Sequence, residues 1–249
     1  MSQGKDNMRL LIEPTAEKAT QLVASIFRSA LCERAAQSKP CRVAFAGGTT
    51  PHALYQTLAR YGGELGEPWQ WLEIFFGDER TVPHDHIESN YRMVQRALLD
   101  HVPISLDRVH PMPADADDLD AASAIYERVV RERVPAGANG IPSFDLVLLG
   151  MGGDGHTASL FPNTPALDET SRLVVSQFVP VLGRNRMTFT FPLINAAQAV
   201  VLLVTGEDKA DAVADLMGPS PTVPAARVRP DSGLLYIILD QSAARKMPR

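Results

Sequence analysis

The sequence has few cysteines, no long apolar run and no cluster of basic residues. Its two cysteines, Cys32 and Cys41, are too few for a disulfide framework or a cysteine-based zinc cluster. No apolar stretch reaches the roughly 18 residues that a membrane-spanning helix needs, and residues 1–7 lack the apolar centre of a signal peptide. A net charge of −5 without a lysine- or arginine-rich stripe argues against nucleic acid. We therefore expect a cytoplasmic protein without a membrane or nucleic-acid partner.

What the sequence does contain is an alternation of apolar runs with amphipathic segments. Its 249 residues, 45% of them hydrophobic, suit one domain over residues 1–249 with a flexible tail at residues 1–8. Helical spacing is found at residues 16–31, with Thr15 as N-cap, and at 51–60, 91–98, 119–130 and 207–217. Strand-like runs lie at 42–46, 71–76, 144–149, 173–179, 187–191, 200–205 and 234–239. This order predicts the α/β class, with a doubly wound, largely parallel sheet and helices on both of its faces.

The most informative segment spans residues 144–162. An apolar run of strand length leads into four glycines within six residues, among which Asp154 and His156 stand two positions apart. Ligands of open α/β sheets bind just beyond the carboxyl ends of the strands. Histidine is the side chain whose ordinary pKa suits proton transfer near neutral pH. The segment therefore indicates a catalytic turn.

Two other interpretations of this segment are open. Gly150, Gly152 and Gly155 fit the G-x-G-x-x-G pattern of dinucleotide sites. That pattern should open a helix and be followed by an acidic residue about 20 positions on. Here prolines at 162 and 165 break any long helix, and the next strand-like run ends without an acid. His156 as a hydrogen-bonded structural histidine remains the second alternative.

Two more strand ends carry polar residues. Gly47, Gly48, Thr49 and Thr50 precede a helix, where backbone N–H groups, hydroxyls and the helix dipole favour an anion. This turn lacks the lysine of an ATP-binding loop, although a glycine pair before a helix is often only a packing feature. The second strand end carries Asp78, Glu79 and Arg80, which indicate either a surface charge cluster or a functional site. In a parallel sheet, all three strand ends open on the same edge.

Scattered cations and histidines complete the set of candidates. Arg184, Arg186 and Lys209 lie in turns or helix starts and suit phosphate, although each alone is more often a surface charge. His84 and His86 flank Asp85, but without a third placed ligand they are a weak metal signal. We therefore expect neither a metal nor a cofactor.

Taken together, these motifs resemble those of 6-phosphogluconolactonases over roughly residues 10–245. The motifs are, in order, 47–51, 78–80 with Pro83, Ser89 and Asn90, 149–162, 186–188, and Gly206 with Lys209 and Ala210. The related glucosamine-6-phosphate deaminases typically read Asp-Gly-His-x-Ala-Phe-Asn-Glu-Pro at the catalytic turn. This chain has Phe161 where that family places its catalytic glutamate, which favours the lactonase.

The resemblance implies a Rossmann-type deaminase/lactonase architecture and a carboxylic ester hydrolase without a cofactor. Its substrate would be 6-phospho-D-glucono-1,5-lactone, hydrolysed in the oxidative pentose phosphate pathway by a monomer or small homo-oligomer. His156 is expected as the general base, with Asp154 orienting or polarising the site. The 6-phosphate is expected on the 47–50 turn, Arg186 and Lys209.

The remaining expected contacts are less specific. Arg80 and Arg184 are candidates for the phosphate, the sugar hydroxyls or the lactone oxygen, and Asp78 and Gly153 complete the predicted substrate-binding set. A rival from another class is a non-catalytic sugar-phosphate sensor on the same fold. Such sensors usually carry a DNA-binding module, for which a first helix near residue 15 leaves no room.

Overall fold

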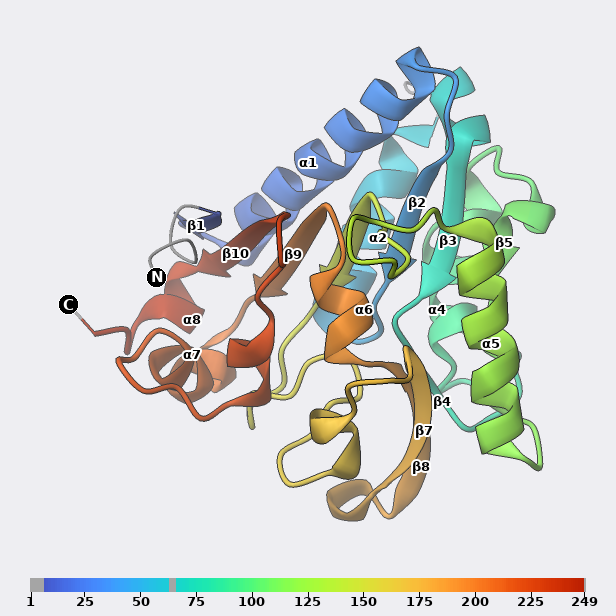
Figure 1. Ribbon diagram of the computed structural model, residues 1–249. Coiled ribbons are helices and arrows are strands. Elements are labelled where there is room, and N and C mark those ends of the chain that lie inside the picture. The colour runs from blue at the N-terminus through green and yellow to red at the C-terminus, as the bar shows by residue number, and fades with distance from the viewer. Residues whose placement is uncertain (1–6, 63–65, 249) are drawn as a thin grey trace.

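The structure is a computed structural model, which describes residues 7–62 and 66–248. Seven parallel strands form its central sheet (Figure 1). In spatial order the strands are β1 (Met8–Glu13), β10 (Leu234–Asp240), β9 (Ala199–Val204), β6 (Leu146–Leu149), β2 (Cys41–Phe45), β3 (Leu72–Phe76) and β5 (Val109–His110). The predicted α/β class with a largely parallel sheet is thereby confirmed.

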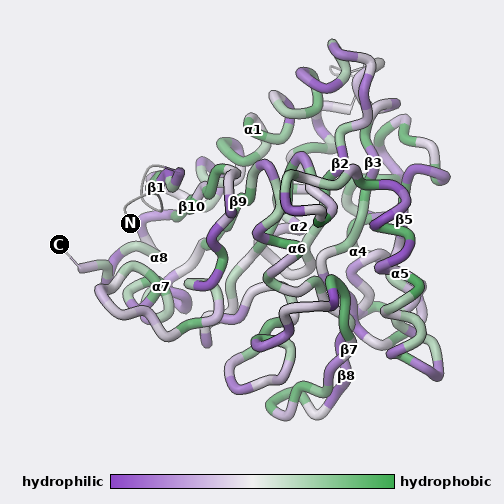
Figure 2. The backbone as a smooth tube through the Cα atoms, in the orientation of Figure 1, coloured by the Kyte–Doolittle hydropathy of each residue, from purple (hydrophilic) through white to green (hydrophobic). Residues whose placement is uncertain are grey.

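Helices lie on both faces of this sheet (Figure 1). The α-helices are α1 (Ala16–Ala36), α2 (Thr49–Arg60), α4 (Asn90–Ala97), α5 (Leu119–Arg133), α6 (Phe191–Asn195), α7 (Ala210–Leu216) and α8 (Gln241–Ala244). Short 3₁₀ turns are η1 (Glu67–Trp71), η2 (Leu99–His101), η3 (Leu106–Arg108), η4 (Pro165–Asp168), η5 (Pro180–Leu182), η6 (Glu207–Lys209) and η7 (Pro224–Arg227). Figure 2 shows hydrophobic and hydrophilic residues alternating along α1 and α5, as expected of helices that pack one face on a sheet.

A second, smaller sheet departs from the expected pattern. The predicted strands near 173–179 and 187–191 are present as β7 (Val174–Val179) and β8 (Arg184–Phe189). They pair antiparallel with each other, and β8 pairs antiparallel with β4 (Asp78–Arg80). The reason is the connection: only residues 180–183 join β7 to β8, and Gly183 closes the turn at φ +61°. Parallel pairing would need a crossover of a dozen or more residues.

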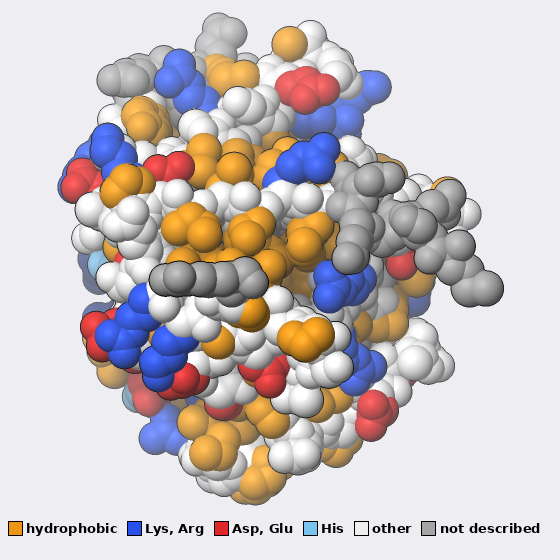
Figure 3. Space-filling view, turned by 90° about the vertical axis from the view of Figure 1, so that its left-hand side faces the viewer, with side chains coloured by type: hydrophobic (Ala, Val, Ile, Leu, Met, Phe, Trp, Pro, Cys, Tyr) orange, Lys and Arg blue, Asp and Glu red, His pale blue; other side chains and the backbone are white. Residues whose placement is uncertain are grey.

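The sequence pattern does not predict the amino-terminal strand. Of the expected tail at residues 1–8, residues 1–6 lie outside the described residues, whereas Met8 already opens β1. β1 is an edge strand that exposes Leu11 and Ile12 in part. Figure 3 views the molecule from this side and shows apolar side chains exposed between charged ones. The predicted N-cap Thr15 is confirmed, because its side chain accepts the backbone N–H of Lys18 at 3.2 Å.

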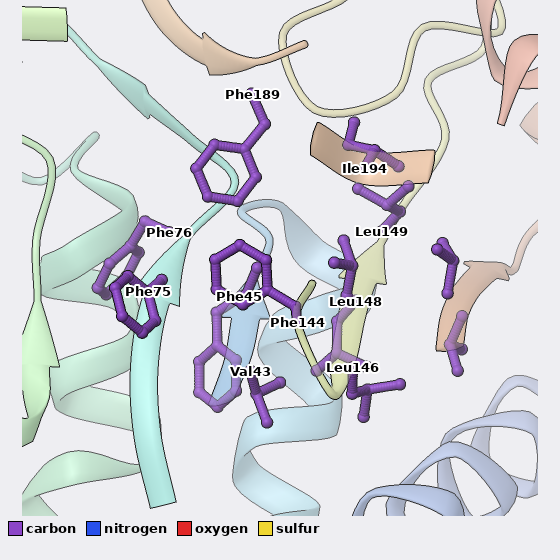
Figure 4. Packing of buried hydrophobic residues seen from close by; sticks show 14 of the residues in the cluster. Val43, Phe45, Phe75, Phe76, Phe144, Leu146, Leu148, Leu149, Phe189 and Ile194 are labelled. Atoms are coloured by element: carbon purple, nitrogen blue, oxygen red, sulfur yellow. The ribbon is translucent and has the colours of Figure 1, made fainter. Parts of the chain in front are cut away.

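Aromatic side chains fill the core on both faces of the sheet. On the α1 side, the Phe45 ring stacks on Tyr55 at a centroid distance of 4.8 Å. On the other side, the Phe144 ring lies between those of Phe75 and Phe189, at 5.2 and 5.5 Å (Figure 4). All of these rings are buried. This packing fixes where β2, β3 and β6 end, and so fixes the turns that follow them.

One buried hydroxyl joins α5 to the sheet. The Tyr126 hydroxyl donates to the carbonyl of His110 at 2.8 Å and accepts the N–H of Phe76 at 2.9 Å. Both partners lie at the ends of neighbouring strands, so this hydroxyl satisfies backbone groups that the ladder leaves open.

We predict that Tyr126→Phe lowers the free energy of unfolding by about 1–3 kcal/mol, because it leaves buried backbone groups without a partner. Urea denaturation followed by circular dichroism measures this. The control is Tyr236→Phe, since the Tyr236 hydroxyl makes no hydrogen bond within the described residues. A loss no larger than that of the control contradicts the prediction.

Candidate active site

The carboxyl ends of β2, β3 and β6 meet at one edge of the sheet, as predicted. A cavity of about 340 Å³ lies there, lined by the turns that follow these strands and by parts of β4, β8 and η6. Nine of the twelve predicted site residues line it: Gly47, Gly48, Thr49, Thr50, Asp78, Arg80, His156, Arg186 and Lys209. The three that do not are Asp154, Gly153 and Arg184.

The turn after β6 holds an imidazole against a carboxylate. His156 Nδ1 lies 2.5 Å from Asp154 Oδ1, and that oxygen also accepts the backbone N–H of His156 at 3.1 Å. An ionised carboxylate only accepts, so Nδ1 donates, and in the neutral imidazole the lone pair is therefore on Nε2. Burial acts to raise the pKa of Asp154, but the hydrogen bond and charge of His156 hold that pKa below the ordinary carboxyl value.

Glycine is required in this turn for two separate reasons. A Cβ on Gly152 would lie 2.2 Å from the His156 ring, so any side chain there would displace the imidazole. Gly155 adopts φ +76°, a left-handed conformation that other residues rarely take. The glycines of the motif therefore shape the turn that presents His156.

Phe161 packs directly on this imidazole. The two ring centroids are 3.9 Å apart with an interplanar angle of 21°, and both rings line the cavity. The sequence marks Phe161 only as a departure from the deaminase pattern. Its stacking on His156 depends on how the chain folds back over residues 157–160, which the local sequence does not reveal.

The turn after β2 has the form of an anion site. Gly48 takes φ +103° and serves as the N-cap of α2, which begins at Thr49 and thus two residues before the expected Pro51. Lys209 approaches the same cavity from η6 and pairs with Asp208 at 2.9 Å. Thr50 Oγ1 lies 3.0 Å from Thr205 Oγ1 at the end of β9. Free N–H groups at a helix N-terminus, together with a lysine, favour a bound anion.

Two guanidinium groups reach the cavity from the smaller sheet. Arg80 and Arg186 are direct cross-strand partners on β4 and β8, and both line the cavity. Burial, and next the charge of Arg80, lower the pKa of Arg186. Within the described residues, neither guanidinium has a carboxylate at ion-pair distance. Like charges placed opposite each other destabilise a strand pair, so this arrangement favours an anionic ligand.

Arg184 and Gly153 differ from the other predicted contacts. Arg184 Nη1 lies 2.5 Å from Glu88 Oε2, its side chain is about half exposed, and it is not part of the cavity wall. Gly153 faces the backbone of Asp208 instead, because a Cβ added at Gly153 would lie 3.4 Å from the carbonyl oxygen of Asp208. The placement of Arg184 results from the β7–β8 hairpin, which the sequence did not predict.

Some residues of the site had no assigned role in the sequence. Ser159 lines the cavity and donates from Oγ to Asp78 Oδ2 at 2.7 Å. Asn90 Nδ2 donates to the Asp78 carbonyl at 2.9 Å. Glu79 is fully buried, and burial raises its pKa although the backbone N–H groups of Asn90, Tyr91 and Arg80 oppose that rise. In the sequence, Ser89 and Asn90 belong to the motif around residues 78–90 but have no assigned role in the site.

The weak metal signal finds no support in the geometry. His84 Nε2 lies 2.8 Å from the carbonyl oxygen of Met112, and His86 lies beside Glu88. Among the described residues, no group of three or more histidine, cysteine, aspartate or glutamate side chains is arranged to hold a metal. No described helix is both long and apolar enough to cross a membrane.

An anion turn, a guanidinium pair and an imidazole–carboxylate pair at the carboxyl edge are typical of α/β proteins that act on small anionic ligands. The sequence profile described as glucosamine-6-phosphate isomerases/6-phosphogluconolactonase matches residues 14–237. The chain therefore belongs to this family.

Individual relatives agree with the family. A 6-phosphogluconolactonase of Synechocystis sp. is 39% identical over 244 residues, which cover 97% of this chain and 95% of the relative. One from Mycobacterium tuberculosis is 41% identical over 213 residues, covering 83% and 85%. The solved structure of 6-phosphogluconolactonase from Trypanosoma cruzi has a TM-score of 0.86 at 29% identity and covers 97% of both chains.

We predict that inorganic phosphate binds at Arg186 and not at Arg184. Arg186→Ala should weaken binding by roughly tenfold or more, because a hydrogen bond to a charged group contributes about 1.5–3 kcal/mol. The measurement is the rise in melting temperature with phosphate at constant ionic strength. Arg184→Ala is the matched control, and an equal loss in both variants is the result that contradicts the assignment.

Proposed function

We propose that this chain hydrolyses 6-phospho-D-glucono-1,5-lactone to 6-phospho-D-gluconate, with His156 as the general base that activates water. One observation carries this proposal: His156 Nδ1 is occupied by Asp154, which leaves Nε2 as the proton acceptor on a cavity that is also lined by Arg80, Arg186 and Lys209. The relatives named 6-phosphogluconolactonase support the same substrate. The reaction belongs to the oxidative pentose phosphate pathway.

The phosphate would be bound far from the reacting carbon. The 47–50 turn, Lys209 and Arg186 are the groups suited to the dianion, because they combine N–H donors with positive charge. Arg80 is the remaining cation of the wall and suits a sugar hydroxyl or the lactone oxygen. Binding energy from the phosphate would then hold the lactone carbonyl against His156.

In the proposed reaction, His156 Nε2 takes a proton from water as the water oxygen bonds to the lactone carbonyl carbon. The carbonyl electrons move to its oxygen, which becomes an oxyanion that a nearby donor stabilises. Asp154 stabilises the imidazolium that forms. The oxyanion then reforms the carbonyl, the bond to the ring oxygen breaks, and that oxygen takes the proton from His156. The product is an open-chain acid, and the base is restored.

Deaminase chemistry fits this cavity less well. The deaminase pattern places a glutamate at the position of Phe161, and here an apolar ring stacks on the imidazole instead. A non-catalytic sensor would also bind the sugar phosphate, but binding alone does not need a proton acceptor held in place by a carboxylate. Hydrolysis accounts for both the anion-binding groups and His156.

We predict that His156→Asn lowers kcat by roughly 10²–10⁴, the usual effect of losing a general base. Wild-type kcat should fall on the acid side, because a protonated imidazole cannot accept a proton. The lowered pKa of Asp154 keeps that carboxylate ionised until the pH falls below the ordinary carboxyl range. Rates are measured after subtraction of spontaneous hydrolysis. The control is His101→Asn, outside the cavity, and near-wild-type turnover by His156→Asn disproves the role.

We predict no release of ammonia from glucosamine 6-phosphate, because Phe161 cannot act as the acid or base that the deaminase glutamate supplies. A coupled ammonia assay with the purified chain, run beside the lactone assay, tests this. Deamination at a rate comparable to lactone hydrolysis would assign the chain to the deaminases instead.

A further inference from the structure

Asp78 is a nearly buried carboxylate that borders the cavity. Its side chain is 7% exposed, and it stands at the start of β4. Ser159 Oγ donates to its Oδ2 at 2.7 Å, and Asn90 Nδ2 lies 3.3 Å from its Oδ1. Each carboxylate oxygen therefore has one neutral donor from a different part of the chain.

Both donors are themselves held in place. Ser159 is 1% exposed, and its backbone N–H donates to Thr188 Oγ1 at 3.1 Å, while Gln177 Nε2 donates to its carbonyl at 2.5 Å. Asn90 is also 1% exposed, and its backbone N–H donates to Glu79 Oε1 at 2.7 Å. Buried side chains with fixed backbones have little freedom to follow a moving partner. The Asp78 carboxylate is therefore confined to one orientation.

This carboxylate still has acceptor capacity for a ligand. A carboxylate offers about four lone-pair positions, and the two donors occupy one on each oxygen. Within the described residues, no cation lies at ion-pair distance from Asp78. A negative charge facing the cavity repels phosphate and attracts O–H donors. Asp78 is therefore suited to the hydroxyl-bearing part of a sugar phosphate and not to its phosphate.

We propose that Ser159 is a positioning residue that, together with Asn90, orients Asp78 to accept a hydrogen bond from one ring hydroxyl of the substrate. The hydroxyl is thereby required for efficient turnover, and the chain discriminates against sugar-phosphate lactones that lack it. This inference rests on the proposed function for the identity of the substrate. It assigns a role in substrate specificity to Ser159, three positions after His156 in the sequence.

The test compares 6-phospho-D-glucono-1,5-lactone with its 2-, 3- and 4-deoxy forms. For one of the deoxy lactones, wild-type kcat/KM should fall roughly tenfold or more, the scale of a hydrogen bond to a charged group. In Ser159→Ala the ratio of kcat/KM for the full lactone to kcat/KM for that deoxy lactone should shrink to about threefold or less, because a freed carboxylate no longer favours the hydroxyl. In an Asp78→Asn background, Ser159→Ala should change the ratio no further.

The matched control is Ser123→Ala. Ser123 is equally buried and donates to the Leu119 carbonyl at 2.7 Å on α5, so the change removes the same hydroxyl outside the cavity. It should leave the ratio at its wild-type value. If Ser159→Ala does not fold, Ser159→Cys keeps the volume with a much weaker donor and is assessed in the same way.

Three results overturn the proposal: no discrimination by the wild type, an equal loss on every lactone in Ser159→Ala, or the same change of ratio in Ser123→Ala. If the wild type hydrolyses no lactone, the proposed function fails separately. In that case the same comparison is made by calorimetry with 1,5-anhydroglucitol 6-phosphate and its deoxy analogues. An unchanged preference in Ser159→Ala then refutes the positioning role.

Discussion

The geometry of the site depends on one buried carboxylate, that of Glu79. It accepts the backbone N–H groups of Arg80, Asn90 and Tyr91 and the hydroxyl of Ser89, and none of its side chain is exposed. These bonds join β4 to the start of α4. Because a charge buried without hydrogen bonds is strongly unfavourable, the two segments can hardly separate while the chain is folded. Asp78 and Arg80, on either side of Glu79, are held at the cavity as a result.

The cavity lies where two sheets of different pairing meet. The parallel sheet contributes the 47–50 turn and the His156 turn, and the antiparallel sheet contributes Arg80 and Arg186. Short β4 is the contact between them: it follows β3 after a single glycine and pairs with β8. His156 and the Arg80–Arg186 pair thus stand on different sheets, and Gly77 is the shortest connection between the two sheets along the chain.

Turns that directly follow buried strands could be brought together from the sequence, and most side-chain contacts between separate segments could not. The turns at 47–50 and 150–156 follow buried strands, so the rule for parallel sheets was enough to bring them together. The ranges of β2, β3, β9 and β10 came from apolar runs alone. In contrast, β1 is an edge strand with a short, partly exposed apolar run at residues 10–12. The pairing of β7 with β8 depends on the four-residue turn between them. Three contacts form only when separate segments have folded against each other: Arg184 with Glu88, Phe161 with His156, and Ser159 with Asp78.

Gly47 and Asn90 illustrate a dependence that links distant parts of the chain. A Cβ on Gly47 would lie 1.9 Å from Asn90 Oδ1, so the amide occupies the space that any other residue would need. The same amide reaches Asp78. A larger residue at position 47 would therefore displace the Asn90 side chain, which contacts Asp78 on another part of the cavity. A side chain at position 47 therefore requires a smaller residue at position 90, and that change would remove the amide that donates to Asp78.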